Sequence, residues 1–149
     1  MIDNIPLIIK KTIEKKSISD FKKVLPTVNI TLENVTFDPK GKEYVLLSCG
    51  PDLTQRLSIG YPSIVKRTAG VAYFVIYTPI ASNNKNQTTD RAYELGGVIS
   101  NVLEDKTFSD VDDKVKIMCL DATYGKLGFR DEYFVASVSI PYRAEYIKC

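Results

Sequence analysis

DEYFVASVSIPYRAEY, residues Asp131–Tyr146, is the stretch of sequence that decides the fold. Its apolar side chains alternate, with the series from Phe134 to Tyr142 on one side and the series from Tyr133 to Pro141 on the other. A period of two is typical of a half-buried β-strand, because successive side chains leave a pleated backbone on opposite faces. Few strands in a small protein are this long, so we expect this one to be the spine of a sheet.

Pro141 modifies that expectation near the end of the strand. Proline has no backbone N–H and cannot donate to a strand ladder, so it usually lies at an edge or where pairing ends. We therefore expect the strand to leave the sheet at Pro141. Tyr142 and Arg143 would then lie at a rim, where a second copy of the chain could contact them.

Two segments have the spacing of amphipathic helices. The first is Ile2–Lys16, where Asn4 can act as the N-cap and Pro6 fits the first turn. The second runs from Thr88 or Thr89 to about Leu103. Residues 17 to 25 are compatible with either a short helical turn or a loop.

Further segments have the composition of strands, turns or loops. Strands are predicted at Tyr44–Cys49, Lys66–Thr78 and Val115–Ala122, with an irregular strand or extended segment at Ile30–Phe37. Asp105–Lys114 is predicted to be an acidic loop, and Tyr124–Arg130 the turn into the final strand. The Lys66–Thr78 strand is apolar on both faces, so it should lie inside the sheet or have its second face covered by a neighbouring copy.

The order of these elements predicts an α+β fold in a single domain, residues 1 to 149. We expect one antiparallel sheet of about four strands, with two helices packed on one face. A long loop, Gly50–Val65, would join the first two strands. It is either a hairpin with irregular ends or a binding arm, and the sequence does not decide between them.

Composition excludes several kinds of chemistry. The chain has no histidine, which rules out Ser/His and Cys/His nucleophilic arrangements and histidine metal sites. Its three cysteines are far apart, which argues against a disulfide framework and against a zinc site. The acidic run Asp110–Asp113 lacks the pattern of a calcium loop and is expected to be solvated. We therefore expect a protein without catalytic activity, cofactor or metal.

The charge of the chain says less about its function than the missing residue types do. The net charge of +2 does not argue for a nucleic-acid partner. Residues 1 to 23 carry six lysines against three acids, whereas residues 87 to 114 carry seven acids against three basic residues. These opposite signs suit contact between identical copies, but solvated helix faces explain the same counts and are favoured. Apolar runs are too short for a membrane span, and the first residues do not resemble a signal peptide.

Nine tyrosines and no tryptophan allow two interpretations. Tyrosine rings can stack on single-stranded nucleic acid, but arginine and lysine are not interleaved with these rings. A core, rim or subunit-interface use is favoured, because tyrosine buries a large ring and keeps a polar group.

Four segments, in order, resemble the tail terminator (tail completion) proteins of long-tailed bacteriophages. They are Leu32–Phe37 (LENVTF), Tyr44–Leu46 (YVL), Arg67–Pro79 with its RTAGV and VIYTP ends, and Val138–Ala144 (VSIPYRA). The chain departs from the family pattern at Leu32, where an aromatic residue is common, and at Thr36, where proline is common.

The resemblance implies a structural virion protein that assembles as a ring, typically a hexamer, on the end of the tail tube. Such a ring stops tube polymerisation and provides the surface that joins the tail to the head. Its partners would be other copies of itself, the major tail tube protein and a head-completion or connector protein, and DNA can pass through the ring. It would be located in the virion, and in the host cytoplasm during assembly.

The residues predicted to contact the tube or a neighbouring copy come from three regions. They are Leu53, Arg56, Leu57 and Tyr61 of the long loop, Arg67 and Tyr73 of the doubly apolar strand, and Tyr142 and Arg143 of the last strand. Two other functions remain open: another phage neck or head-completion component, and a small nucleic-acid-binding module.

Overall fold

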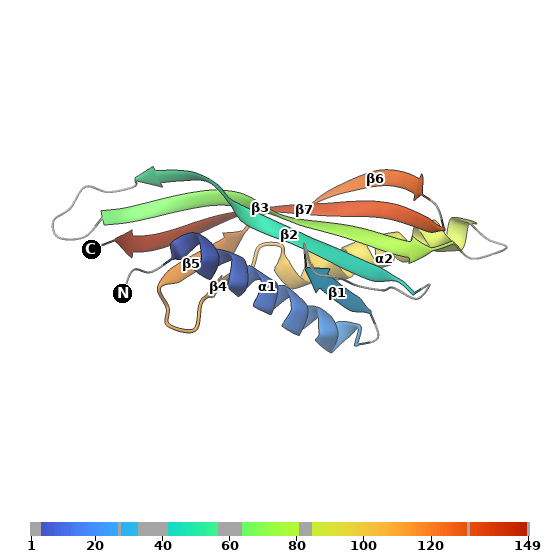
Figure 1. Cartoon of the computed structure of the whole chain (residues 1–149), viewed down its shortest axis with the longest axis horizontal. Helices are drawn as coiled ribbons and strands as arrows, with labels where there is room; N and C mark the ends of the chain where they lie inside the picture. Colours follow the sequence, from blue (N-terminus) through green and yellow to red (C-terminus); the bar gives the residue numbers. More distant parts are fainter. Residues whose placement is uncertain are drawn as a thin grey trace.

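The computed structural model describes residues 4–26, 28–32, 42–56, 64–80, 85–130 and 132–148. At residues 50–56, 64–65, 85–87 and 147–148 it describes the backbone only. Two helices and seven strands occur in these parts of the chain (Figure 1): α1 (Ile5–Val24), β1 (Asn29–Leu32), β2 (Tyr44–Arg56), β3 (Ile64–Pro79), α2 (Lys85–Leu103), β4 (Thr107–Ser109), β5 (Val115–Cys119), β6 (Thr123–Arg130) and β7 (Tyr133–Lys148).

All seven strands belong to one sheet, in the order β1-β2-β3-β7-β5-β4. The remaining strand, β6, pairs with the first half of β7, whereas β5 pairs with the second half. β1 runs parallel to β2, and the other described pairs are antiparallel. The sheet is therefore mixed, with β3 and β7 at its centre.

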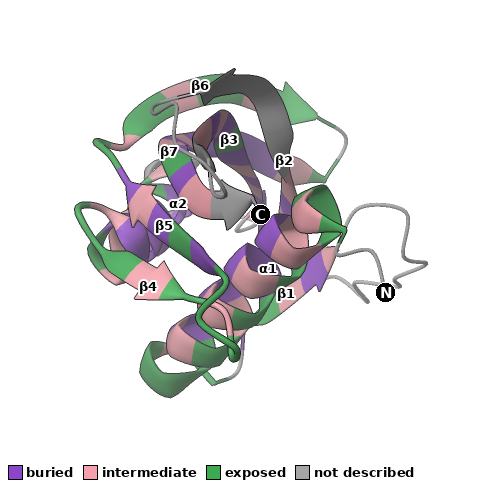
Figure 2. Cartoon of the chain, turned by 90° about the vertical axis from the view of Figure 1, so that its left-hand side faces the viewer, coloured by how far each residue is buried: buried purple, intermediate pink, exposed green. Residues whose placement is uncertain are grey.

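The sheet curls into a half-barrel that carries both helices (Figure 2). α1 contacts β1, β2 and β5, α2 contacts β3 and β7, and the two helices touch each other. Their shared core consists of side chains that are almost completely buried. The largest are Tyr142, Phe21, Phe74, Phe134, Ile9, Ile13, Leu47, Ile76, Leu95, Ile99, Leu103 and Ile117.

The predicted fold class is therefore wrong, because the sheet differs from the one that we expected. A four-stranded antiparallel sheet with two helices on one face does not describe a mixed seven-stranded half-barrel. Two strands were missed because their sequences do not have a strand pattern. β6 contains Gly125 and Gly128 and indicated a turn, while β4 is a three-residue strand inside the predicted acidic loop.

The predicted long loop between the first two strands is wrong over most of its length, and the alternative of a hairpin with irregular ends is confirmed for the described residues. β2 continues to Arg56 and β3 begins at Ile64, so the two strands form a hairpin. The register shifts between Pro51 and Leu53, which is a β-bulge. A bulge lets an irregular sequence remain paired, which explains why this segment had no clear strand period.

The strand containing Pro141 does not leave the sheet, contrary to expectation. Pro141 pairs with Val71 of β3, and β7 continues to Lys148. The backbone oxygen of Pro141 accepts a hydrogen bond from the Leu120 N–H at 2.8 Å, away from β3. In an antiparallel strand the N–H and C=O of one residue point to the same side. The side of Pro141 on which another residue would carry its N–H therefore faces the short gap between β6 and β5. Neither strand pairs with Pro141 there, so the absent N–H breaks no ladder.

Helix α1 was predicted over Ile2–Lys16, but it begins at Ile5 and continues to Val24. The Leu7 N–H donates to the Asn4 side-chain oxygen at 3.2 Å, which confirms the N-cap. The helix passes through Ser17 to Val24, because the Ser17 hydroxyl is satisfied by the Ile13 carbonyl at 2.7 Å and Phe21 extends the buried stripe. No helix in the described part of the chain is long and apolar enough to cross a membrane.

Candidate functional site

The side of β2, β3 and β7 that faces away from the helices is the strongest candidate for an interaction surface. Alternate residues of a strand point to opposite faces, and the inward series supplies the core. We call the other series the outer face. It consists of Tyr44, Leu46 and Ser48 of β2, Arg67, Ala69, Val71, Tyr73, Val75 and Tyr77 of β3, and Tyr133, Val135, Ser137, Ser139, Pro141, Arg143 and Glu145 of β7.

Apolar and aromatic side chains dominate the middle of the outer face. Tyr73, Val75 and Tyr77 are half-buried on β3, and Val71 remains 38% exposed. The prediction that the doubly apolar strand lies inside the sheet is confirmed, because β3 is paired on both sides. Its second face is covered only in part by its own chain. Aromatic rings beside aliphatic side chains are typical of protein interfaces.

Three tyrosines form a cluster at one end of the outer face. The rings of Tyr44 and Tyr77 are stacked, with centroids 4.5 Å apart and planes 6° apart. Tyr133 meets both rings edge-on, at 5.9 and 6.1 Å. Burial raises the pKa of Tyr44 above its ordinary value, and the neighbouring hydroxyl groups of Tyr77 and Tyr133 raise it further. The cluster is thus an aromatic surface held together by ring-to-ring contacts.

Charged residues lie at the opposite end of the outer face. Arg67 and Glu145 occupy paired positions on β3 and β7, and the Arg67 side chain donates to Glu145 Oε1 at 3.1 Å and 2.5 Å. Lys116 of β5 pairs with Glu145 on the other side of β7. Arg143 is exposed between Ala69 and Met118 and has no ion pair with any described residue. This end of the outer face therefore has an excess of positive charge.

The structure brings three of the eight predicted contact residues onto the outer face. These are Arg67, Tyr73 and Arg143. Tyr142 lies on the inner side with 1% exposure, so it is a core residue and not a rim residue of the single chain.

Two of the other four predicted contact residues lie on a described strand. Leu53 and Arg56 lie on β2, where their backbones pair with Ala69 and Lys66. Leu57 and Tyr61 fall outside the described residues.

Four residues of this surface were missed. Tyr44, Tyr77 and Tyr133 form the aromatic cluster, and Glu145 is the partner of Arg67. Alternation had placed Tyr77 and Tyr133 on one side of their strands, whereas Tyr44 belongs to a continuous apolar run without alternation. Their proximity depends on strand register, which is set by pairing between segments far apart in the chain.

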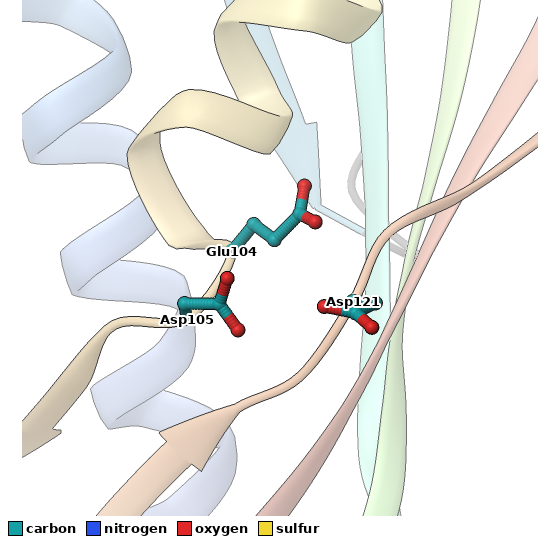
Figure 3. Close-up of side chains that lie close together, drawn as sticks. All are labelled: Glu104, Asp105 and Asp121. Carbon is teal, nitrogen blue, oxygen red and sulfur yellow. The ribbon is translucent and has the colours of Figure 1, made fainter.

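A second group of polar side chains lies near the end of α2 (Figure 3). Glu104, Asp105 and Asp121 place carboxylate oxygens within 4.8 Å of one another. The acidic run Asp110–Asp113, which was expected to be solvated, is not part of this group. The Asp110 carboxylate accepts a hydrogen bond from the Val115 N–H at 2.9 Å and shapes a turn. Ser100 already donates to Glu104. A calcium site needs six to eight oxygen ligands, so three exposed or half-buried carboxylates do not by themselves make one.

Comparison with known proteins shows the fold alone. The chain matches no protein-family model and no curated protein. One solved structure superposes on it with a TM-score of 0.69 at 16% sequence identity, over 92% of this chain and 93% of that chain. The curled sheet with its two helices is therefore an arrangement that another natural protein shares.

Proposed function

We propose that this chain is a tail terminator protein of a long-tailed bacteriophage, which forms a ring on the end of the tail tube. The observation that carries the proposal is the position of the segments that resemble that family. Three of the four lie on adjacent strands at the centre of the sheet, β2, β3 and β7. Tyr44 is paired with Tyr77, and Val71 with Pro141, so segments distant in sequence share one surface.

The chemistry of that surface supports an assembly role. The family-like segments supply Tyr44, Val71, Tyr77 and Arg143 to the outer face, together with most of its other side chains. Tyrosine and arginine are enriched where proteins meet, and an aliphatic patch gains free energy when it is covered. A binding surface of this kind needs no catalytic group or cofactor.

In this proposal the ring acts by covering the tube end. The next tube subunit then has no surface to bind, so polymerisation stops, and the far side of the ring receives a head-completion or connector protein. The partners are copies of this chain, the tube protein and that connector. The chain would be found in the virion, after assembly in the host cytoplasm.

Electron microscopy of purified tail tubes mixed with the protein tests the proposal. We expect a ring of density at one tube end and no further growth when tube subunits are added. Arg143→Glu should reduce tube capping about tenfold or more, because it reverses a charge on the outer face without breaking an ion pair to any described residue. Lys22→Glu, an equal charge change on the exposed side of α1, should leave capping unchanged.

Two results would overturn the proposal. Binding to connector rings but not to tubes would identify another neck component. Binding to duplex DNA that weakens steeply with salt, without binding to tubes, would identify a nucleic-acid-binding module.

A further inference from the structure

A groove lies on the helical side of the molecule, away from the outer face. It has a volume of about 560 Å³ and follows α1 from Leu7 to Asp20, with β4 and the turn after it as the opposite wall. At 1.5 Å per residue, this part of α1 is about 20 Å long. The groove is thus long enough to hold three to four turns of a partner helix, about 12 residues.

Apolar side chains are exposed on both rims of the groove. Leu7 on α1 is 47% exposed, and Val111 at the tip of the opposite turn is 85% exposed. Phe108 also lines the groove, and the Lys16 ammonium group lies over its ring, 5.8 Å from the centroid. Turn tips usually carry polar residues, so an exposed valine in the same groove as an exposed leucine indicates a surface that a partner covers.

The wall formed by the turn is held in place by its own hydrogen bonds. The Asp110 carboxylate accepts from the Val115 N–H at 2.9 Å, and the Asp113 N–H donates to the Asp110 carbonyl at 3.1 Å. Asp113 also has a positive φ of 59°, which closes the turn tightly. A fixed wall reduces the entropy lost when a ligand binds.

Lysines outnumber acids along the groove, three to two. Its two acids are engaged, because Asp20 forms ion pairs with Lys16 and Lys23 and Asp110 shapes the turn. Lys15 is exposed and has no ion pair with a described residue. Lys11 forms a long ion pair with Glu14, at 3.7 Å, and its side chain is 65% exposed.

Lys11 and Lys15 are one helical turn apart, on the flank of an apolar groove. On a partner helix, side chains four residues apart are also one turn apart, so two of them can contact Lys11 and Lys15 together. We propose that this groove binds an amphipathic helix of a partner protein, with leucine-like side chains between Leu7 and Val111 and acidic side chains on Lys11 and Lys15. The proposal does not depend on the tail-terminator function.

Fluorescence anisotropy with two synthetic peptides tests the proposal. Both peptides form a helix of about 18 residues with leucines on one face, and they carry either glutamate or lysine on the flank. The full-length protein should bind the glutamate peptide about tenfold or more tightly than the lysine peptide. Raising the salt concentration should weaken this binding.

Matched variants locate the binding site. Lys11→Glu with Lys15→Glu should weaken binding of the glutamate peptide about tenfold or more, and so should Val111→Asp. Lys22→Glu with Lys42→Glu makes the same change in net charge at exposed positions outside the groove. This control should bind within about twofold of wild type.

Several outcomes would overturn the proposal. They are equal binding of the two peptides, equal loss of binding in both double variants, and no effect of Val111→Asp. Binding to anionic phospholipid vesicles that is lost in the groove variants, without binding to the glutamate peptide, would assign the groove to a membrane surface instead.

Discussion

Gly125 on β6 and Gly97 on α2 differ in what surrounds them. A Cβ atom at Gly125 would lie 2.6 Å from the Ser137 hydroxyl oxygen, whereas a Cβ at Gly97 would meet nothing within 4 Å. Ser137 is 6% exposed and has little space to move. Gly125 therefore allows β6 to approach β7 closely. From the sequence this glycine had indicated a turn, but the structure shows that it is needed for the close contact between two strands.

Gly125→Ala should lower the free energy of unfolding by about 1 to 2 kcal/mol, because the added methyl group displaces Ser137. Gly97→Ala should raise it by up to about 1 kcal/mol, because alanine is the better residue inside a helix. Urea unfolding followed by circular dichroism measures both changes.

A double-mutant cycle supplies the control for Gly125. Ser137→Ala removes the oxygen that the new methyl group would meet, so Gly125→Ala should cost much less in that background. An equal cost in both backgrounds would show that the close approach is not the reason for the glycine.

At the scale of elements, α1 depends on its first turn, where Asn4 was predicted as the cap and accepts from the Leu7 N–H. Asn4→Ala should lower the free energy of unfolding by about 1 kcal/mol, because a backbone N–H at the helix start loses its partner. Asn4→Asp keeps an acceptor and should remain close to wild type. Thermal unfolding compares the three proteins, and equal melting temperatures would contradict a role for the cap.

The elements that could be predicted from sequence are those with a clear local pattern. The alternation in β7 and the apolar stripe of α1 gave strand and helix correctly. β6 has exposed positions on both sides, so it lacks the periodicity that marks a half-buried strand. The parallel pairing of β1 with β2 is a contact between distant segments, and no local pattern encodes it.

The candidate site could be predicted only in part for the same reason. The alternation of β7 had placed Tyr142 on the same side as Phe134, which is the inner side. The expected effect of Pro141 on pairing led to the opposite position. Arg67 and Glu145 pair across 78 residues of sequence, a contact that becomes visible only when the strand register is known.

At the scale of the whole molecule, Val71 is a test of self-association. It lies near the middle of the outer face and is 38% exposed. If copies of the chain meet there, Val71→Asp would bury a charge in an apolar interface and weaken association more than about tenfold. Analytical ultracentrifugation over a concentration series measures this, with circular dichroism as the check on folding.

Val24→Asp is the matched control for Val71→Asp. Val24 is 55% exposed at the end of α1, away from the outer face, so the same substitution there should not change association. A wild-type protein that is monomeric up to about 1 mM, in the absence of tail tubes, would contradict a free-standing ring.

The position of β7 at the centre of the sheet also affects when the protein can fold. β7 pairs with β3, β5 and β6, yet it is the last of the seven strands to leave the ribosome. Until then β3 has no partner on one side, and its apolar residues are exposed to other nascent chains. The centre of the sheet can therefore form only after β7 has been synthesised, and the pairing of distant segments makes folding slow. During that interval the unpaired edge of β3 is a place where nascent chains can aggregate.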